Sequence, residues 1–435
     1  MEKIFKLHAH QTTIRTEVNA GLTTFFAMAY IIFLNPVFLS ATGMPSAGVL
    51  VATCISTAIG SLLCAFFSNK PIAMAPGMGM NAFFAYTLCG LYGYTWQQAL
   101  ALTFISGVLY LAVVVSPLRD RIIAAVPTNL KHAISAGIGL FIALIGLLDA
   151  GLITMTGGFP ALGDFSSLQV RLALVGLLVT IVLTIWGIKG SLILGMLVTI
   201  LLSLLFGQTA LPSQILGWPT AISDVFLQLD FAGLVADHAV ASSVITLAAL
   251  ILSMAMVDLF DSLGFLIGAG SKAGMLDEEG NLDGARGILV ADASATVLGS
   301  LCGTSTVTVY AESATGIAVG GRTGLTAVVV AICFLLAAFF SPLAGIVTSA
   351  ATAPALIIVG IYLLMEIKKV RFDRMDDAVP AFLTIIAMPF GYSITTGIAV
   401  GFIAHVICKL AAKRWKELNV SVVALAIVFV LYFCL

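Results

Sequence analysis

Charged side chains are scarce in this sequence. Lys and Arg number 20 and Asp and Glu 21 among 435 residues, whereas 60% of the residues are hydrophobic. Soluble domains carry roughly 25% charged residues, which solvate their surface. The apolar fraction excludes a disordered chain, and the lack of a Lys/Arg-rich stripe excludes a nucleic-acid binder. The composition therefore predicts an all-α polytopic protein that is embedded in a lipid bilayer.

Several functional motifs are also missing. The seven Cys form no C-x-x-C pair and no Cys/His cluster, so we expect no zinc or iron–sulfur site and no other cofactor. The chain contains no Walker sequence, H-E-x-x-H or G-x-S-x-G, which argues against an ATP-driven pump, a protease and a lipase. The polar N-terminus lacks the apolar core of a signal peptide. These absences favour a secondary transporter over an enzyme.

Long apolar stretches are what the sequence has instead. A membrane-spanning helix needs about 20 residues, and such stretches occur near 19–40, 47–68, 73–90, 97–116, 129–149, 169–187, 189–206, 240–268, 286–302, 304–319, 322–342 and 346–366. Three shorter segments follow near 378–392, 394–411 and 420–434.

The basic residues predict the orientation of these spans. With a cytoplasmic N-terminus, 15 of the 20 Lys and Arg fall in inside connections, including Arg119 and Arg121. The long outside connections 150–168 and 207–239 contain none. Cytoplasmic loops of membrane proteins are enriched in Lys and Arg, so we expect a multi-pass protein of the plasma (inner) membrane with its N-terminus in the cytoplasm.

A weak internal repeat has an offset of 225 residues. The tripeptide Ser-Pro-Leu at 116–118 recurs at 341–343, and the same shift pairs 21–40 with 246–265 and 75–90 with 300–315. Seven spans precede the first counterpart, so the two halves should have opposite orientations, as in transporters with inverted repeats. Generic similarity between apolar segments is the alternative explanation.

Two polar or glycine-rich segments interrupt the apolar pattern. Segment 75–84 contains Pro76, Gly77 and Gly79 ahead of Asn81, and segment 303–313 is rich in Thr and Ser ahead of Glu312. Both compositions suit a short extended strand that leads into a half-helix within the membrane. Such backbone is tolerated there only where it lines a cavity or is buried in protein. Close packing of small residues between helices is the alternative.

Four carboxylates lie inside predicted spans without a neighbouring Lys or Arg. They are Asp258 and Asp261, three residues apart, then Asp292 and Glu312. Intramembrane acids commonly serve substrate or proton pathways. We expect this of Glu312 and Asp258, and a structural role for Asp292. The competing explanation is a carboxylate that caps the N-terminus of a half-helix.

These motifs together resemble a known family. Segment 75–84, Asp-Leu-Phe-Asp-Ser at 258–262, Gly-Thr-Ser-Thr-Val-Thr at 303–308, Glu-Ser at 312–313 and Gly-Gly-Arg-Thr-Gly-Leu-Thr at 320–326 are similar to the purine branch of the nucleobase–cation symporters. These are the azaguanine-like permeases for adenine, guanine and hypoxanthine. The resemblance extends from about Phe5 to the C-terminus.

The resemblance implies a fold of about 14 transmembrane segments in two inverted repeats of seven, with short strands before half-helices 3 and 10. It implies an elevator-like proton symporter that forms a homodimer through a gate domain. The implied parts are a cytoplasmic N-terminus at 1–16, a core domain at 17–118 and 240–345, a gate domain at 119–206 and 346–435, and an extracytoplasmic loop at 207–239. It also assigns substrate contacts to Asp258, Glu312 and Asn81, with Asp261 as a supporting acid.

The chemistry of a purine agrees with that assignment. A purine is flat and neutral, and its edge carries N–H donors and ring-nitrogen acceptors. Carboxylates can accept from the N–H groups, an amide can do both, and aromatic rings can stack on the base or simply line the site. The candidate substrate-binding residues are Asp258, Glu312, Asn81, Phe83, Thr306 and Phe260, and the candidate proton-coupling residues are Glu312, Asp258 and Asp261.

Two other functions remain open at this point. An anion transporter or channel of the same architecture would need positive charge, and Arg322 just after the second half-helix is the nearest candidate. An intramembrane enzyme would need a nucleophile beside a base, for which Ser305 or Thr308 near Glu312 is a poor candidate.

Overall fold

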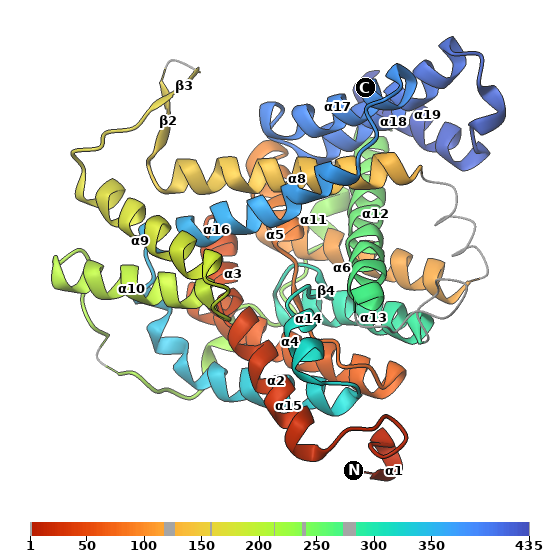
Figure 1. Cartoon of the computed structure of the whole chain (residues 1–435). Helices are drawn as coiled ribbons and strands as arrows, with labels where there is room; N and C mark the ends of the chain where they lie inside the picture. Colours follow the sequence, from red (N-terminus) through yellow and green to blue (C-terminus); the bar gives the residue numbers. More distant parts are fainter. Residues whose placement is uncertain are drawn as a thin grey trace.

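The computed structural model describes residues 2–116, 127–156, 159–212, 214–236, 241–272 and 284–434, without the side chains of residues 3, 159, 235–236, 241–243, 260 and 263–272 (Figure 1). Arg119 and Arg121, which we expected in inside connections, lie outside the described residues.

Helices make up most of the described chain. Nine of those helices are long and apolar enough to cross a membrane, and four shorter apolar helices accompany them. The α-helices are α1 (Glu2–Phe5), α2 (Ile14–Met28), α3 (Ile31–Ser40), α4 (Ser46–Ser68), α5 (Met78–Ala82), α6 (Trp96–Val115), α8 (Thr128–Asp149), α9 (Leu168–Ile185), α10 (Ser191–Leu205), α11 (Phe231–Ala236), α12 (Ala241–Lys272), α13 (Ala285–Cys302), α14 (Ser313–Val319), α15 (Gly324–Ala337), α16 (Ser349–Leu364), α17 (Met375–Phe390), α18 (Ile394–Ala411) and α19 (Val420–Cys434).

Short helices of other types join or extend these elements. A π-helix, η1 (Phe83–Leu91), continues α5, and the 3₁₀ segments are η2 (Thr220–Asp224), η3 (Ala338–Ile346), η4 (Met365–Lys369) and η5 (Trp415–Glu417). The strands are β1 (Met74–Pro76), β2 (Ile153–Thr156), β3 (Phe159–Leu162) and β4 (Val307–Val309). This architecture confirms the predicted all-α membrane protein.

The first span begins earlier than the sequence predicted. We expected residues 19–40, but α2 starts at Ile14 because the Thr13 side chain caps it, accepting from the Thr16 N–H at 3.2 Å. The span then breaks at residues 29–30 before α3 begins. This break places Tyr30 in the interior, where it is 2% exposed.

Strands β1 and β4 confirm the short extended segments ahead of the half-helices. They pair antiparallel, with Met74 opposite Val309 and Pro76 opposite Val307, and both strands are fully buried. The predicted register of the repeat is wrong here, because β4 starts 233 residues after β1 rather than 225. Helix α13 continues to Cys302 and ends at Gly303 with φ +91°, so the chain turns extended later than at residue 300.

The helices pack in two groups. Helix α4 packs against α13 and α15, and α2 packs against α14 and α15, so the two repeats interlock around β1 and β4. Helix α8 packs lengthwise against α16 and also against α17, as Figure 1 shows across the middle of the molecule. Gly360 allows this approach, since a Cβ there would lie 2.7 Å from the Gly139 carbonyl oxygen.

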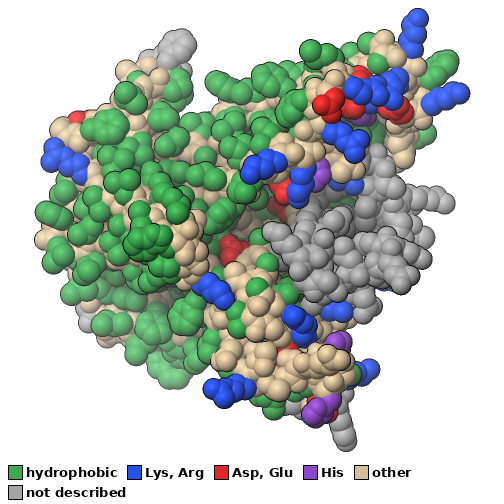
Figure 2. Space-filling view, viewed as in Figure 1, with side chains coloured by type: hydrophobic (Ala, Val, Ile, Leu, Met, Phe, Trp, Pro, Cys, Tyr) green, Lys and Arg blue, Asp and Glu red, His purple; other side chains and the backbone are tan. Residues whose placement is uncertain are grey.

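The surface separates apolar from charged regions. In Figure 2 hydrophobic side chains cover the side formed by α9 and α10, where Leu178, Ile185 and Leu201 are exposed. Lys and Arg gather instead near the N-terminus, at the start of α17 and at the end of α18. A broad apolar surface with charged ends is what a lipid bilayer requires.

Candidate functional site

The site is built around the crossing of β1 and β4. The Gly77 N–H donates to the Thr306 carbonyl at 3.1 Å, which extends the strand pairing beyond Pro76. A Cβ at Gly77 would lie 2.7 Å from Cγ2 of Thr308, so the two segments can approach this closely only with glycine. Helix α5 begins directly after this glycine, and α14 begins four residues after β4.

Asn81 connects the two interrupted segments. Its side chain is buried in α5, and its Oδ1 accepts a hydrogen bond from the Ser305 hydroxyl just ahead of β4. The neighbouring Thr306 hydroxyl is also buried and has no partner within the described part of the chain. An unpaired buried hydroxyl is costly unless a ligand or water satisfies it. The Thr306 hydroxyl is therefore better placed to bind a polar ligand than Oδ1 of Asn81, which is already bonded to Ser305.

Asp258 lies in a buried polar cluster between α12 and α13. Its Oδ2 accepts from the Thr296 hydroxyl at 2.8 Å, while its Oδ1 has no partner among the described residues. Four residues further along α12, Ser262 contacts Asp292 and the Thr308 hydroxyl. The face of α12 that carries Asp258 and Ser262 is thus turned toward α13 and β4.

Asp292 is fully satisfied within this cluster. It accepts from the Tyr110 hydroxyl at 2.8 Å, the Ser262 hydroxyl at 2.6 Å and the Val309 N–H at 3.0 Å. These donors come from α6, α12 and β4, so one carboxylate connects three elements to α13. Asp292 has the geometry of a structural residue that holds β4 in place.

Glu312 belongs to a different cluster. Its Oε1 accepts from the Tyr30 hydroxyl at 2.7 Å, and the Tyr30 ring lies 6.3 Å from the Tyr310 ring. Glu312 occupies the N-cap position of α14, but its side chain makes no capping hydrogen bond. Glu312 is only partly buried, whereas Tyr30 and Tyr310 are buried. The capping explanation therefore does not apply to Glu312.

Asp261 and Phe83 occupy separate positions. Asp261 is partly buried, and a Cβ at Gly79 would lie 3.8 Å from its Oδ2 and 2.9 Å from Cγ2 of Ile138. Asp261 therefore lies where α5 and α12 approach α8. Phe83 is fully buried at the start of η1, which fits apolar packing. The Phe260 side chain lies outside the described residues.

The acids predicted for the site thus lie in separate places and do not form one cluster. Among the described residues, no hydrogen bond joins Asp258 or Asp261 to Glu312. Tyr30 was missed by the sequence reasoning, although a phenol within a long apolar stretch is a detectable signal. The described chain also contains no group of three or more His, Cys, Asp or Glu that could hold a metal ion.

Glu17 was missed as well, and it explains the motif at 320–326. Its carboxylate is buried and accepts from the backbone N–H groups of Arg322, Thr323 and Thr326 at 2.9–3.3 Å, and from the Thr326 hydroxyl at 2.6 Å. The Arg322 guanidinium donates to the carbonyls of Ile317 and Gly321 at 2.8 and 2.7 Å. Arg322 therefore closes the C-terminal end of α14.

Comparisons with known proteins identify permeases among the relatives in sequence and a transporter among the relatives in structure. The family described as "Permease family" matches residues 15–400. An adenine permease from Escherichia coli is 41% identical over 432 residues, 99% of this chain and 95% of that protein. A guanine/hypoxanthine permease from Bacillus subtilis is 41% identical over 433 residues, 98% of each chain. The transmembrane domain of a cyanobacterium bicarbonate transporter shares the fold, with a TM-score of 0.61 and 16% identity over 88% of this chain and 96% of that one.

Proposed function

The chain belongs to the Permease family, with adenine and guanine/hypoxanthine permeases among its relatives, and from this premise we propose that it imports purine nucleobases by proton symport. It is a multi-pass membrane permease and not an enzyme. The proposal includes a plasma-membrane location, a cytoplasmic N-terminus and a homodimer formed through the gate domain.

One observation carries the proposal most directly. Glu312 is a partly buried carboxylate beside the crossed strands, and among the described residues its hydrogen-bond partner is a phenol and not a cation. A carboxylate without a neutralising cation can take up a proton, and its oxygens can accept from purine N–H groups. The Thr306 hydroxyl and Oδ1 of Asp258, which have no partner among the described residues, offer further polar contacts.

The coupling follows from the cost of buried charge. Moving an ionised carboxylate through an apolar barrier costs several kcal/mol, whereas the protonated form crosses more readily. We propose that proton entry neutralises Glu312, or Asp258 with support from Asp261, and that the loaded core domain (17–118 and 240–345) then moves past the gate domain (119–206 and 346–435). Asn81, Phe83 and Phe260 complete the proposed binding site.

Transport by reconstituted protein tests the proposal. Proteoliposomes with a proton gradient should accumulate labelled adenine, hypoxanthine or guanine, and purine addition without a gradient should alkalinise the outside medium. Unlabelled purines should compete, and uracil should compete poorly. Equal competition by uracil, or uptake with no proton movement, would contradict the proposal.

An anion transporter is the second candidate, because the bicarbonate transporter shares the fold. Arg322, the cation that the sequence suggested for this function, is poorly suited, since its guanidinium is engaged with the carbonyls of Ile317 and Gly321. Bicarbonate or chloride uptake that persists in Glu312→Gln, together with no purine uptake by the unmodified protein, would favour this candidate.

A further inference from the structure

A cavity lies away from the crossed strands. It has a volume of about 780 Å³ and is enclosed by the start of α8, the segment between η4 and α17, the end of α18 and η5. Its lining contains six Lys and Arg and three Asp and Glu. Four of these cations are ion-paired, and Arg371 and Lys416 are the two without an ion pair in the described part of the chain. Cavities of roughly 300–1,000 Å³ are typical for small-molecule ligands.

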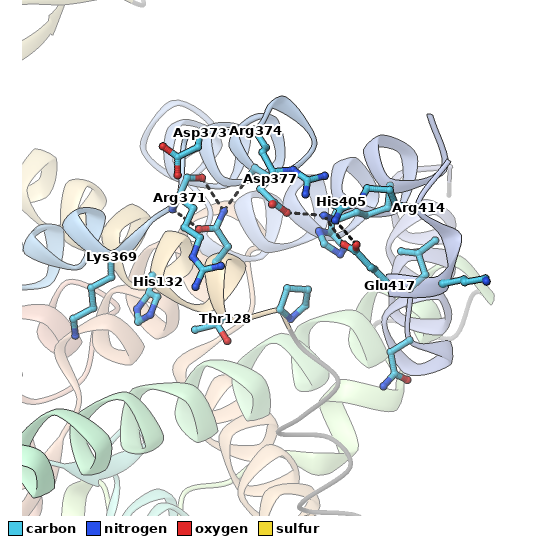
Figure 3. A pocket seen from close by; sticks show the side chains of 16 residues that line it. Thr128, His132, Lys369, Arg371, Asp373, Arg374, Asp377, His405, Arg414 and Glu417 are labelled. Carbon is cyan, nitrogen blue, oxygen red and sulfur yellow. Dashed lines mark hydrogen bonds and ion pairs between the residues drawn. The ribbon is translucent and has the colours of Figure 1, made fainter. Parts of the chain in front are cut away.

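Two of the acids in the lining, Asp377 and Glu417, are engaged in ion pairs, as is the neighbouring Asp376. The Lys409 ammonium is bound by Asp376 at 2.9 Å, Asp377 at 2.7 Å and Glu417 at 3.1 Å, and its side chain is only 4% exposed. Arg414 also pairs with Asp376, at 3.0 Å. These ion pairs connect α17, α18 and η5 on one side of the cavity, and Figure 3 shows Asp377, Arg414 and Glu417 there.

Arg371 is held in place by its backbone while its side chain is left free. The Arg371 N–H donates to Oδ1 of Asn129 at 2.6 Å, and Nδ2 of Asn129 donates to the carbonyls of Arg371 and Asp377 at 3.3 and 3.0 Å. Within the described part of the chain, the guanidinium itself has no hydrogen-bond or ion-pair partner. Figure 3 shows it pointing toward Thr128, into the cavity.

Other groups in the lining also favour a negatively charged ligand. The Lys416 ammonium is likewise without a partner among the described residues. The first turn of α8 contributes Thr128 and Asn129 to the lining, and the N-terminal end of a helix favours negative charge. Asp373, the acid in the lining that has no ion pair in the described structure, lies at the rim in Figure 3.

We propose that this cavity binds a phosphate-bearing ligand through the Arg371 guanidinium. The planar fork of an arginine matches two phosphate oxygens, which a single ammonium does not. The phosphate can belong to an anionic lipid headgroup or to a soluble phosphate compound. An apolar groove of about 370 Å³ is lined by Phe372, Met375 and Phe382, and it offers a place for an acyl chain because Phe372 directly follows Arg371 in the chain.

Binding can be measured as a rise in the melting temperature of the purified full-length protein. One arm adds vesicles of phosphatidylglycerol with phosphatidylcholine vesicles as reference, and the other adds inorganic phosphate or AMP. Arg371→Gln should weaken the effective ligand by about tenfold or more, because a charge-assisted bidentate contact is lost. Arg371→Lys should recover part of the affinity, and Lys189→Gln, which removes an exposed charge elsewhere, should change nothing.

The outcomes distinguish a lipid headgroup from a soluble phosphate compound as the source of the phosphate. Stabilisation by phosphatidylglycerol alone that depends on Arg371 identifies a lipid site, and the same dependence with phosphate or AMP identifies a soluble ligand. If neither probe stabilises the protein, or if Arg371→Gln and Lys189→Gln respond alike, the proposal is wrong. The readout is independent of purine uptake, so failure of the proposed transport function leaves the test unaffected.

Discussion

At the scale of single residues, two tyrosine–carboxylate contacts have different expected roles. Tyr30 donates to Glu312 and Tyr110 donates to Asp292, at 2.7 and 2.8 Å. We expect Tyr30→Phe to raise the KM for purine uptake about tenfold, because a hydrogen bond that positions Glu312 is lost. Tyr110→Phe should lower the melting temperature but change KM by less than about twofold. Equal KM changes in the two variants would contradict this division.

A change of Glu312 itself tests proton coupling. Glu312→Gln keeps the size of the side chain but cannot ionise, so purine-dependent proton uptake should disappear while purine binding weakens less. The measurement is external pH during purine addition to proteoliposomes, with Glu366→Gln as a control outside the transport site. Proton uptake that survives in Glu312→Gln would move the coupling role to Asp258 or Asp261.

The sequence revealed which acids are unusual but not where they point. Asp258, Asp292 and Glu312 stood out because carboxylates are rare inside apolar spans. The direction of each side chain depends on contacts far apart in the chain, such as the one between Tyr30 and Glu312, 282 residues away. Periodicity along one helix contains no information about such partners.

At the scale of elements, Glu17 fixes the start of α15. Its carboxylate satisfies three backbone N–H groups and one hydroxyl in the segment from Arg322 to Thr326. We expect Glu17→Ala to lower the free energy of unfolding by roughly 2 kcal/mol or more, since buried donors are left unpaired. The melting temperature of the purified protein is the measurement. Glu2→Ala, at an exposed acid in α1, is the control and should cost little.

Element positions were predictable where local chemistry sets them. The strands before the half-helices follow from glycine, proline and β-branched residues at 74–77 and 304–309, and both strands are present. The register of the repeat was not predictable, since the α13 boundary depends on the left-handed turn at Gly303 and on packing against α4 and α6. Those tertiary contacts override a simple sequence offset.

At the scale of the whole molecule, the elevator proposal requires the two helix groups to slide past each other. An aromatic cluster joins them: Tyr86 of η1 packs edge-on against Phe141 of α8 and against Tyr392, with ring centroids 6.4 and 6.0 Å apart. On the other side Tyr86 packs against Phe38 of α3, at 5.9 Å, within its own proposed domain. In terms of the proposed core and gate domains, Tyr86 therefore takes part in one contact between the two domains and in one contact within the core domain.

Cross-linking these two contacts tests the movement. In a background without native Cys, Tyr86→Cys with Tyr392→Cys and a reducible bifunctional thiol reagent should stop purine uptake, and reduction should restore it. The matched pair, Tyr86→Cys with Phe38→Cys, should keep its uptake after cross-linking because both positions move together. Purine binding should persist in both cross-linked proteins, since neither link passes through Glu312 or Thr306. Unchanged uptake by the cross-linked Tyr86–Tyr392 pair would show that transport needs no displacement at this boundary, and the elevator proposal would then be wrong.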